Sequence, residues 1–144
     1  MSNFIIRVVD GDSPLLVDIL KLRAEVFIHE QGVSPADEID NLDGQATHIA
    51  AVFNEVVIGT LRMLPENGQL HVGRFAVRKN HRKRGIGSDL LRAAERYASE
   101  NNFSGIILAA QISVVPFYEK RGYSKYGDVF LDAGIDHVWM SKKF

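Results

Sequence analysis

The sequence predicts an α/β (α+β) fold with a mixed central sheet, formed by a single domain over residues 1–144. Three observations predict it. Segments rich in β-formers alternate with amphipathic helical ones, and one such helix separates the third strand of a meander from a short, wholly apolar strand. No repeat, low-complexity tract or Pro/Ser-rich linker divides the chain. We expect about six to seven strands and about four helices.

The N-terminal third is predicted to hold one strand and one helix. Residues 4–9 are short and β-rich. Asp12-Ser13-Pro14 is typical of a helix start, and apolar residues then recur at helical spacing from Leu15 to Phe27. We expect this helix to end near Gly32. Residues 34–44 are acidic and rich in turn formers, with room for a short helical turn.

A three-stranded meander is predicted next. Residues 48–53 and 56–64 are strand-like and flank Asn54-Glu55, which gives a hairpin signal. A second turn is expected over residues 65–68, and it leads into a strand at 70–77.

The C-terminal half is predicted to cross over and return. Residues 90–98 carry apolar side chains at the spacing of an amphipathic helix, and residues 106–110 suit a strand buried on both faces. Ser113 can cap a short helix that tolerates Pro116 in its first turn and ends at Gly122. Residues 123–130 and 137–140 close the chain as strands.

Composition excludes several classes of protein. With 46% apolar and 24% charged residues the chain is globular, and without Cys it has neither disulfides nor thiolate chemistry. No apolar run is long enough to span a membrane, and the N-terminus lacks a signal-peptide pattern, so we expect no membrane partner and a cytoplasmic location. No pair of His has metal-ligand spacing, and we infer no metal.

The net charge of −1 conceals two opposite local charges. Residues 24–61 contain seven acids and no Lys or Arg, whereas residues 78–84 contain five Lys or Arg and one His. A basic segment with glycines just before a helix is suited to phosphate, because the helix N-terminus presents free N–H groups. Residues 77–88 are neither a Walker A loop nor a dinucleotide fingerprint, since Leu90 stands where the third Gly would fall.

What remains is the pattern Arg82-x-x-Gly85-x-Gly87, which resembles the acetyl-CoA pyrophosphate loop of the GNAT superfamily of N-acetyltransferases. Downstream, residues 117–123 resemble the F-Y-x-x-x-G-F signature of that superfamily. Lys83 and Gln111 depart from the pattern, in place of the usual Gly and Asn. The cues of the ElaA-like branch are Glu30-Gln31, Glu38-Ile39-Asp40, His48, Gly73-Arg74, Ala110-Gln111 and residues 132–137.

The resemblance implies transfer of an acetyl group from acetyl-CoA to a primary amine of a small metabolite, an amino acid-like molecule or a peptide, by direct attack in a ternary complex. The pantetheine arm would lie between two splayed parallel strands, residues 73–77 and 106–110. The cofactor-binding residues it implies are Phe75, Ala76, Val77, Arg82, Lys83, Arg84, Gly85, Ile86, Gly87, Ser88, Gln111 and Tyr118.

The resemblance also suggests catalytic residues. Tyr118 would protonate the leaving thiolate, and His137 is the first candidate for the base that deprotonates the amine. His48, or Glu38 or Asp40 acting through water, are the alternatives. For Arg74 two roles stay open: it binds a substrate carboxylate, or it is an internal partner of Glu38 or Asp40.

Glu38, Asp40, His48 and Arg74 are thus the candidate substrate-binding residues. Two alternatives to an enzyme remain, a CoA-binding sensor of the same fold and a nucleic-acid-binding module using residues 78–84. Against nucleic acid, the chain is not net basic and the basic segment holds no aromatic residue to stack on bases. An exposed sheet edge near the C-terminal strands is compatible with a homodimer.

Overall fold

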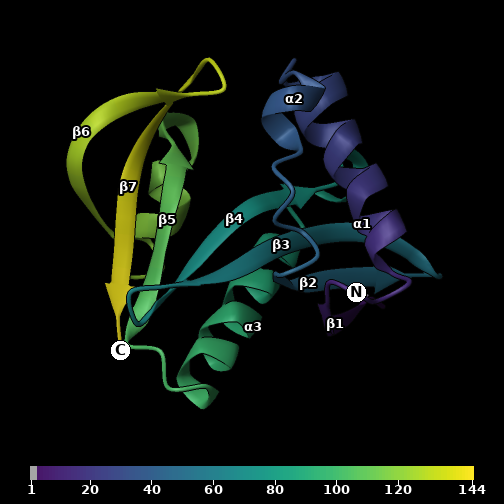
Figure 1. Cartoon of the computed structure of the whole chain (residues 1–144), viewed down its shortest axis with the longest axis horizontal. Coiled ribbons are helices and arrows are strands. Elements are labelled where there is room, and N and C mark those ends of the chain that lie inside the picture. The colour runs from purple at the N-terminus through teal and green to yellow at the C-terminus, as the bar shows by residue number, and fades with distance from the viewer. Residues whose placement is uncertain (1–2) are drawn as a thin grey trace.

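A computed structural model describes residues 3–144 as a seven-stranded mixed sheet with the order β1-β2-β3-β4-β5-β7-β6 (Figure 1). The strands are β1 Ile5–Asp10, β2 Thr47–Phe53, β3 Val56–Glu66, β4 Gln69–Val77, β5 Gly105–Gln111, β6 Ser124–Asp132 and β7 Ile135–Lys143. The α-helices are α1 Leu16–Arg23, α2 Pro35–Glu38, α3 Ile86–Glu100 and α4 Val115–Glu119. The predicted fold class is confirmed, and β1 and β6 form the sheet edges. A homodimer through such an edge stays a prediction.

The sheet splits in its middle, between β4 and β5. These strands are parallel and joined through α3, as predicted, but they pair only from Leu70–Val72 to Ile106–Leu108. Beyond that point they diverge, so that β5, β7 and β6 form one arm and β1 to β4 the other (Figure 1). The split leaves one edge of β4, from Gly73 onward, without a strand partner.

A β-bulge turns β4 where the split begins. Gly73 pairs with Arg62 and Ala76 with Thr60, so Arg74 and Phe75 together face a single residue of β3. Arg74 adopts a φ of 49°, the left-handed region that non-glycine residues rarely enter. The bulge bends the strand and directs its last residues toward the opening between the arms.

Helix α3 holds the two arms together on one face of the sheet. Its apolar stripe, with Leu90, Leu91 and Ala94 fully buried, packs into a core that also contains Leu108 of β5 and Met140 of β7. Helix α1 packs a smaller cluster on the other face, against the arm formed by β1 to β4. The split is therefore covered on one face and open on the other.

The predicted helix over residues 15–32 is two elements. Helix α1 ends at Arg23, and Ala24–Glu30 forms a π-helix, η1, in which Gln31 N–H bonds to Val26 O. The expected end near Gly32 is confirmed by its left-handed φ of 74°. The π-helical turns are wider than those of α1, and they lie just before the chain reaches the opening of the sheet.

Two local predictions are wrong. The meander turn is the two-residue Asn67-Gly68, because β3 continues through Pro65 to Glu66. Ser113 caps no helix: it lies inside a short 3₁₀ turn, Ile112–Val114, and α4 starts afterward with Val114 at its N-cap and no side-chain cap. Over residues 3–144, no helix is long and apolar enough to cross a membrane.

Candidate active site

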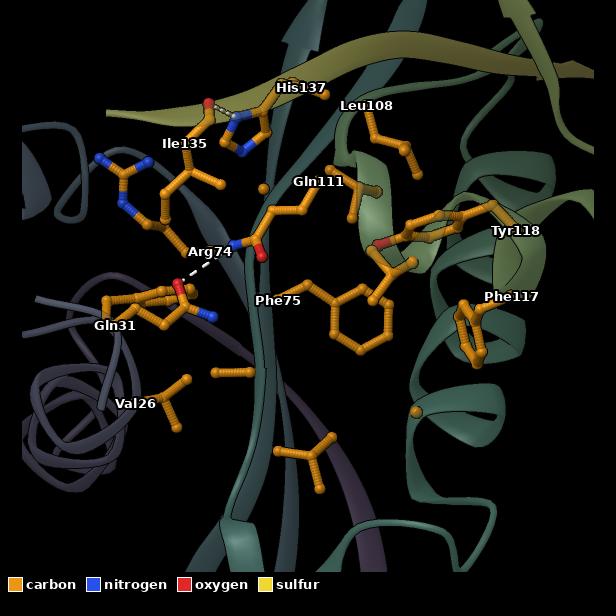
Figure 2. Close-up of a pocket in the computed structure, with 18 of the residues that line it drawn as sticks. Val26, Gln31, Arg74, Phe75, Leu108, Gln111, Phe117, Tyr118, Ile135 and His137 are labelled. Carbon is orange, nitrogen blue, oxygen red and sulfur yellow. Dashed lines mark hydrogen bonds between the residues drawn. The ribbon is translucent and has the colours of Figure 1, made fainter. Parts of the chain in front are cut away.

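A cavity of about 930 Å³ occupies the opening between the two arms of the sheet. It runs from the N-terminus of α3, past Phe75 on β4 and Tyr118 on α4, to the hairpin that joins β6 and β7. Figure 2 shows these side chains converging on one space from η1, β4, β5, α4 and the hairpin. The cavity therefore brings together the two motifs that the sequence singled out.

The phosphate-binding end of the cavity is built from the start of α3. Gly85 is left-handed at φ 79°, and a Cβ added there would meet no atom within 4 Å. The first intrahelical bond runs from Asp89 N–H to Gly85 O, which leaves the N–H groups of Ile86, Gly87 and Ser88 without intrahelical partners. A Cβ on Gly87 would contact Phe117 at 3.5 Å. This geometry fits an anionic group held by backbone N–H groups.

Two of the basic side chains beside this loop form ion pairs with acidic residues of η1. Arg82 forms a bidentate pair with Glu30, and Arg78 pairs with Glu25. Lys83 lines the cavity and is left-handed at φ 65°. The pairing removes two of the five basic charges from the surface that a nucleic acid would need.

Arg84 is the one predicted cofactor-binding residue that does not line the main cavity, and its role stays a prediction. It does not line the main cavity but a separate one of about 480 Å³, together with Phe4 and Phe53. The left-handed residues on either side of it, Lys83 and Gly85, reverse the chain and send its side chain to the far side of the loop. The other predicted cofactor-binding residues, Phe75, Ala76, Val77, Arg82, Lys83, Gly85, Ile86, Gly87, Ser88, Gln111 and Tyr118, all line the main cavity.

Tyr118 projects its hydroxyl into the middle of the cavity. The side chain is 7% exposed and packs edge-on against Phe75, Phe117 and Tyr123. Within residues 3–144, its hydroxyl makes no hydrogen bond, and Figure 2 shows it pointing toward Phe75. Burial raises the pKa of the Tyr118 phenol well above its ordinary range, because the phenolate would lose hydration. The phenol is therefore protonated at neutral pH and can act as a donor.

His137 approaches the same space from β7. It is 8% exposed, and its Nδ1 lies 2.7 Å from Ile135 O. A carbonyl only accepts, so Nδ1 carries the proton and Nε2 has the free lone pair. Phe130 stacks against the ring at 6.0 Å between centroids. The imidazole is thereby held in a base-competent tautomer (Figure 2).

A hydrogen bond between Gln111 and Gln31 crosses the cavity. Gln111 Nε2 donates to Gln31 Oε1 at 3.1 Å, joining the end of β5 to the end of the π-helix (Figure 2). On one side lie Tyr118 and Phe117, and on the other Arg74 and His137. Gln111 therefore stands at the boundary between the two halves of the cavity.

The acidic candidates are fully engaged in ion pairs. Both oxygens of Glu38 accept from Arg23, and both oxygens of Asp40 accept from Arg62. Arg62 holds the pKa of Asp40 well below its usual range, so that this carboxylate is a poor base. Arg74 bonds to Asp40 at 3.2 Å and to Glu38 O at 3.0 Å. Of the two roles left open for Arg74, the structure has the internal partner.

His48 and Asp40 do not line the cavity. His48 is fully buried in β2, and its Nε2 lies 2.9 Å from Asp43 O. The position follows from its register opposite Arg62 in the middle of a sheet arm, which takes it away from the opening. The proposals of His48 as base or substrate ligand are therefore wrong. Glu38 and Arg74 do line the cavity, at its acceptor end.

The structure adds lining residues that the sequence did not single out. Arg121 contacts the Ser88 hydroxyl and lies 3.8 Å over the Phe117 ring, next to the start of α3. His71, Phe130 and Trp139 line the acceptor end. Arg121 lies within the downstream motif at a variable position, while the three aromatic residues come from three strands with no shared local signal. Within residues 3–144, no three His, Cys, Asp or Glu side chains gather as metal ligands would.

The fold and the site together define an acyltransferase of the GNAT class. The family model of the acetyltransferase (GNAT) domain matches residues 16–144, and the chain belongs to this family. It is 40% identical over 128 residues to the uncharacterized N-acetyltransferase YjcF of Bacillus subtilis, covering 88% of this chain and 91% of that protein.

Two solved structures have the same fold. An acyl-CoA N-acyltransferase from Pseudomonas aeruginosa superposes with a TM-score of 0.88 and 28% identity, over 97% of this chain and 99% of that one. Escherichia coli ElaA superposes with a TM-score of 0.87 over 97% and 99% of the two chains, and its 23% identity supports a common fold. The predicted membership of the GNAT superfamily is confirmed, and ElaA shares its fold.

Proposed function

We propose that the protein transfers the acetyl group of acetyl-CoA to a primary amine by direct attack. The observation that carries this proposal is the convergence of the Tyr118 hydroxyl and His137 Nε2 on a single cavity that continues to the free N–H groups of α3. Both side chains are more than nine-tenths buried, yet the donor of Tyr118 and the acceptor of His137 belong to residues that line the cavity, where a ligand can use them.

The residues present fit acetyl-CoA. The start of α3, from Gly85 to Ser88, would hold the pyrophosphate, and the unpaired edge of β4 at Phe75 to Val77 would bind the pantetheine arm as an added strand. Acetyl-CoA supplies an acetyl group activated as a thioester. The remaining chemistry belongs to side chains and backbone groups of this chain.

His137 Nε2 accepts a proton from the ammonium form of the acceptor, which frees the nitrogen lone pair for attack. A backbone N–H of β4, near Phe75 to Val77, stabilises negative charge on the carbonyl oxygen. Tyr118 donates its proton to the departing sulfur, and the second proton that the nitrogen loses as the amide forms restores the phenol. The chain has no Cys, so direct attack is simpler than an acyl-enzyme route.

The test is a thiol-release assay with acetyl-CoA across monoamines, polyamines, amino acids and peptides, with mass spectrometry of the product. The expected result is acetylation of at least one amine and its loss in a Tyr118→Phe, His137→Ala double variant. Calorimetry with CoA runs beside it. Binding of CoA without thiol release from any amine would contradict the enzyme and leave a CoA-binding sensor. Failure to bind CoA would contradict both.

A further inference from the structure

The half of the cavity beyond Gln111, which we call the acceptor pocket, has a composition that selects among amines. Its floor comes from β4, β6 and β7, with His71, Phe130 and Trp139. One wall is α2 with Asp37, and the opposite wall is the β6–β7 hairpin with Asp132. His137 closes the inner end.

The floor of the acceptor pocket is a continuous row of aromatic rings. His71 lies 5.5 Å from Trp139, Trp139 lies 5.6 Å from Phe130, and Phe130 lies 6.0 Å from His137, all between ring centroids. His137 and Trp139 share a face because they are two residues apart on β7. The planes of Phe130 and Trp139 differ by 28°. His71, Phe130 and Trp139 are half-buried, and their rings offer apolar surface against which an aromatic body can pack.

The cationic groups of the acceptor pocket are already committed. Arg62 donates to both oxygens of Asp40 and to Asp43, and Arg74 donates to Asp40 and to the carbonyl of Glu38. The charges of Arg62 and Arg74 are balanced by these carboxylates, so a carboxylate on the substrate would compete with Asp40 for them.

The free charges of the acceptor pocket are negative. Asp37 and Asp132 line the cavity from opposite walls, and within residues 3–144 neither carboxylate has a hydrogen bond or an ion pair. The free cations of the cavity, such as Lys83, belong to its phosphate-binding end. The pocket therefore attracts an ammonium group and repels an anion.

We infer that the acceptor is an arylalkylamine without a carboxylate: an aromatic ring stacked on Trp139 and Phe130, and an ammonium group delivered to His137 past Asp132 and Asp37. The inference rests on the proposed function, since it names the substrate class of that same site. The His137 side chain is 8% exposed and lines the cavity, so an ammonium group that enters the pocket can reach it.

Pairs of compounds that differ only by a carboxylate test the inference. Phenethylamine against phenylalanine, and tryptamine against tryptophan, are compared by kcat/KM at saturating acetyl-CoA. The amine of each pair is expected to exceed its amino acid by about tenfold or more, because Asp40 already balances the guanidinium charges of Arg62 and Arg74 and the free carboxylates Asp37 and Asp132 repel an anion. Equal values, or a preference for the amino acid, would overturn the inference while leaving an active acetyltransferase. Turnover of linear diamines but not of arylalkylamines would also overturn it.

Matched variants separate the charge from the fold. Asp132→Asn is expected to lower kcat/KM for tryptamine by about three- to tenfold, mostly through KM. Asp136→Asn, on the same hairpin but outside the cavity, is the control and should change it by less than about twofold. Equal effects of the two variants would remove the role of Asp132. Trp139→Leu should raise KM for tryptamine more than KM for ethylamine, and equal increases would remove the stacking surface.

The two proposals fail in different ways. If no amine in any set releases thiol, the proposed function itself is wrong. If linear amines or amino acids are acetylated as well as arylalkylamines are, only the substrate class is wrong.

Discussion

Arg82 donates one hydrogen bond from Nη1 and one from Nη2 to the two carboxylate oxygens of Glu30, each at 2.7 Å. These bonds join the phosphate-binding loop to the π-helix η1, and they lower the pKa of Glu30 below its ordinary value. The face of the guanidinium that could bind a phosphate bidentately is therefore occupied by a carboxylate. A phosphate at this position competes with Glu30 for the same donors.

Glu30→Gln is expected to tighten CoA binding by about 1.5- to 5-fold, the range for release of one exposed ion pair. The guanidinium would then meet the phosphates without first losing a charged partner. Calorimetry with CoA at low salt gives the affinity. Glu25→Gln is the matched control, because it breaks the neighbouring pair with Arg78, which does not line the cavity. Weaker binding by Glu30→Gln than by wild type would show that the pair preorganises the loop.

Gly85→Asp is expected to weaken CoA binding by about tenfold or more while the protein stays folded. Asp tolerates the left-handed conformation and is a favourable N-cap, but its carboxylate would stand in the open space where an anion approaches α3. Gly85→Asn has nearly the same size and no charge, so its loss of affinity should be several times smaller. Both are measured by calorimetry. An equal loss in the two variants would mean that bulk, and not charge, matters at this position.

The fold and the outline of the cofactor site were predictable because they depend on local patterns. The alternation of strands with the amphipathic stripe of α3 determines the crossover, and two glycine-containing motifs mark one end and the middle of the cavity. The π-helix was not predictable, since its apolar residues recur almost as they would in an α-helix. That Arg84 lines a separate cavity was not predictable, because a left-handed lysine before it leaves no clear trace in the sequence.

The pairing of charges could not be read from the sequence. Arg62 and Asp40 are distant along the chain, as are Arg23 and Glu38, and only the packing of α1 and α2 over the sheet brings them together. His48 was an alternative candidate for the base, but its strand lies inside the sheet and its side chain is fully buried. The aromatic floor needs three strands in register, which no single segment specifies.

Tyr118→Phe is expected to lower kcat by about 10²- to 10³-fold with little change in the affinity for CoA. The hydroxyl is the only atom removed, and the ring keeps its packing against Phe75 and Tyr123. Tyr123→Phe is the control: its hydroxyl donates to Glu95, so it should lower stability and leave kcat near wild type. Stopped-flow thiol release and calorimetry give the two quantities. A parallel fall in kcat and affinity would contradict proton donation by Tyr118.

His137→Ala is expected to lose about 10²-fold or more in kcat/KM for the amine and to regain part of it with added imidazole. The substitution empties the place of the ring beside Phe130, and a free imidazole can enter from the cavity. His48→Ala is the control, because its buried ring does not face the cavity and added imidazole should not restore activity there. Without rescue of His137→Ala at any imidazole concentration, a role in orientation would replace that of a base.

The stability of the fold should decrease on mild acidification through His48. Burial lowers the pKa of this imidazole below its ordinary value of 6.5, so the folded state holds it neutral while the unfolded chain takes up a proton. Its contribution to the free energy of unfolding is complete above about pH 6.5 and is lost as the pH falls below that value, at up to about 1.4 kcal/mol per pH unit. Asp40 and Asp43 have lowered pKa values, so their contributions are lost only below about pH 4.

His48 therefore affects the stability of the fold in a higher pH range than Asp40 and Asp43 do. Urea unfolding of wild type and of His48→Gln between about pH 7.5 and pH 4.5 measures the slope. The His48→Gln variant is expected to be less stable at neutral pH, because Gln must replace a fully buried ring and its contact with Asp43 O. Its stability should nevertheless fall less steeply below about pH 6.5. Burial also lowers the pKa of His71, so His71→Gln should remove a second part of the slope. If His48→Gln keeps the wild-type slope, proton uptake at His48 does not drive the loss.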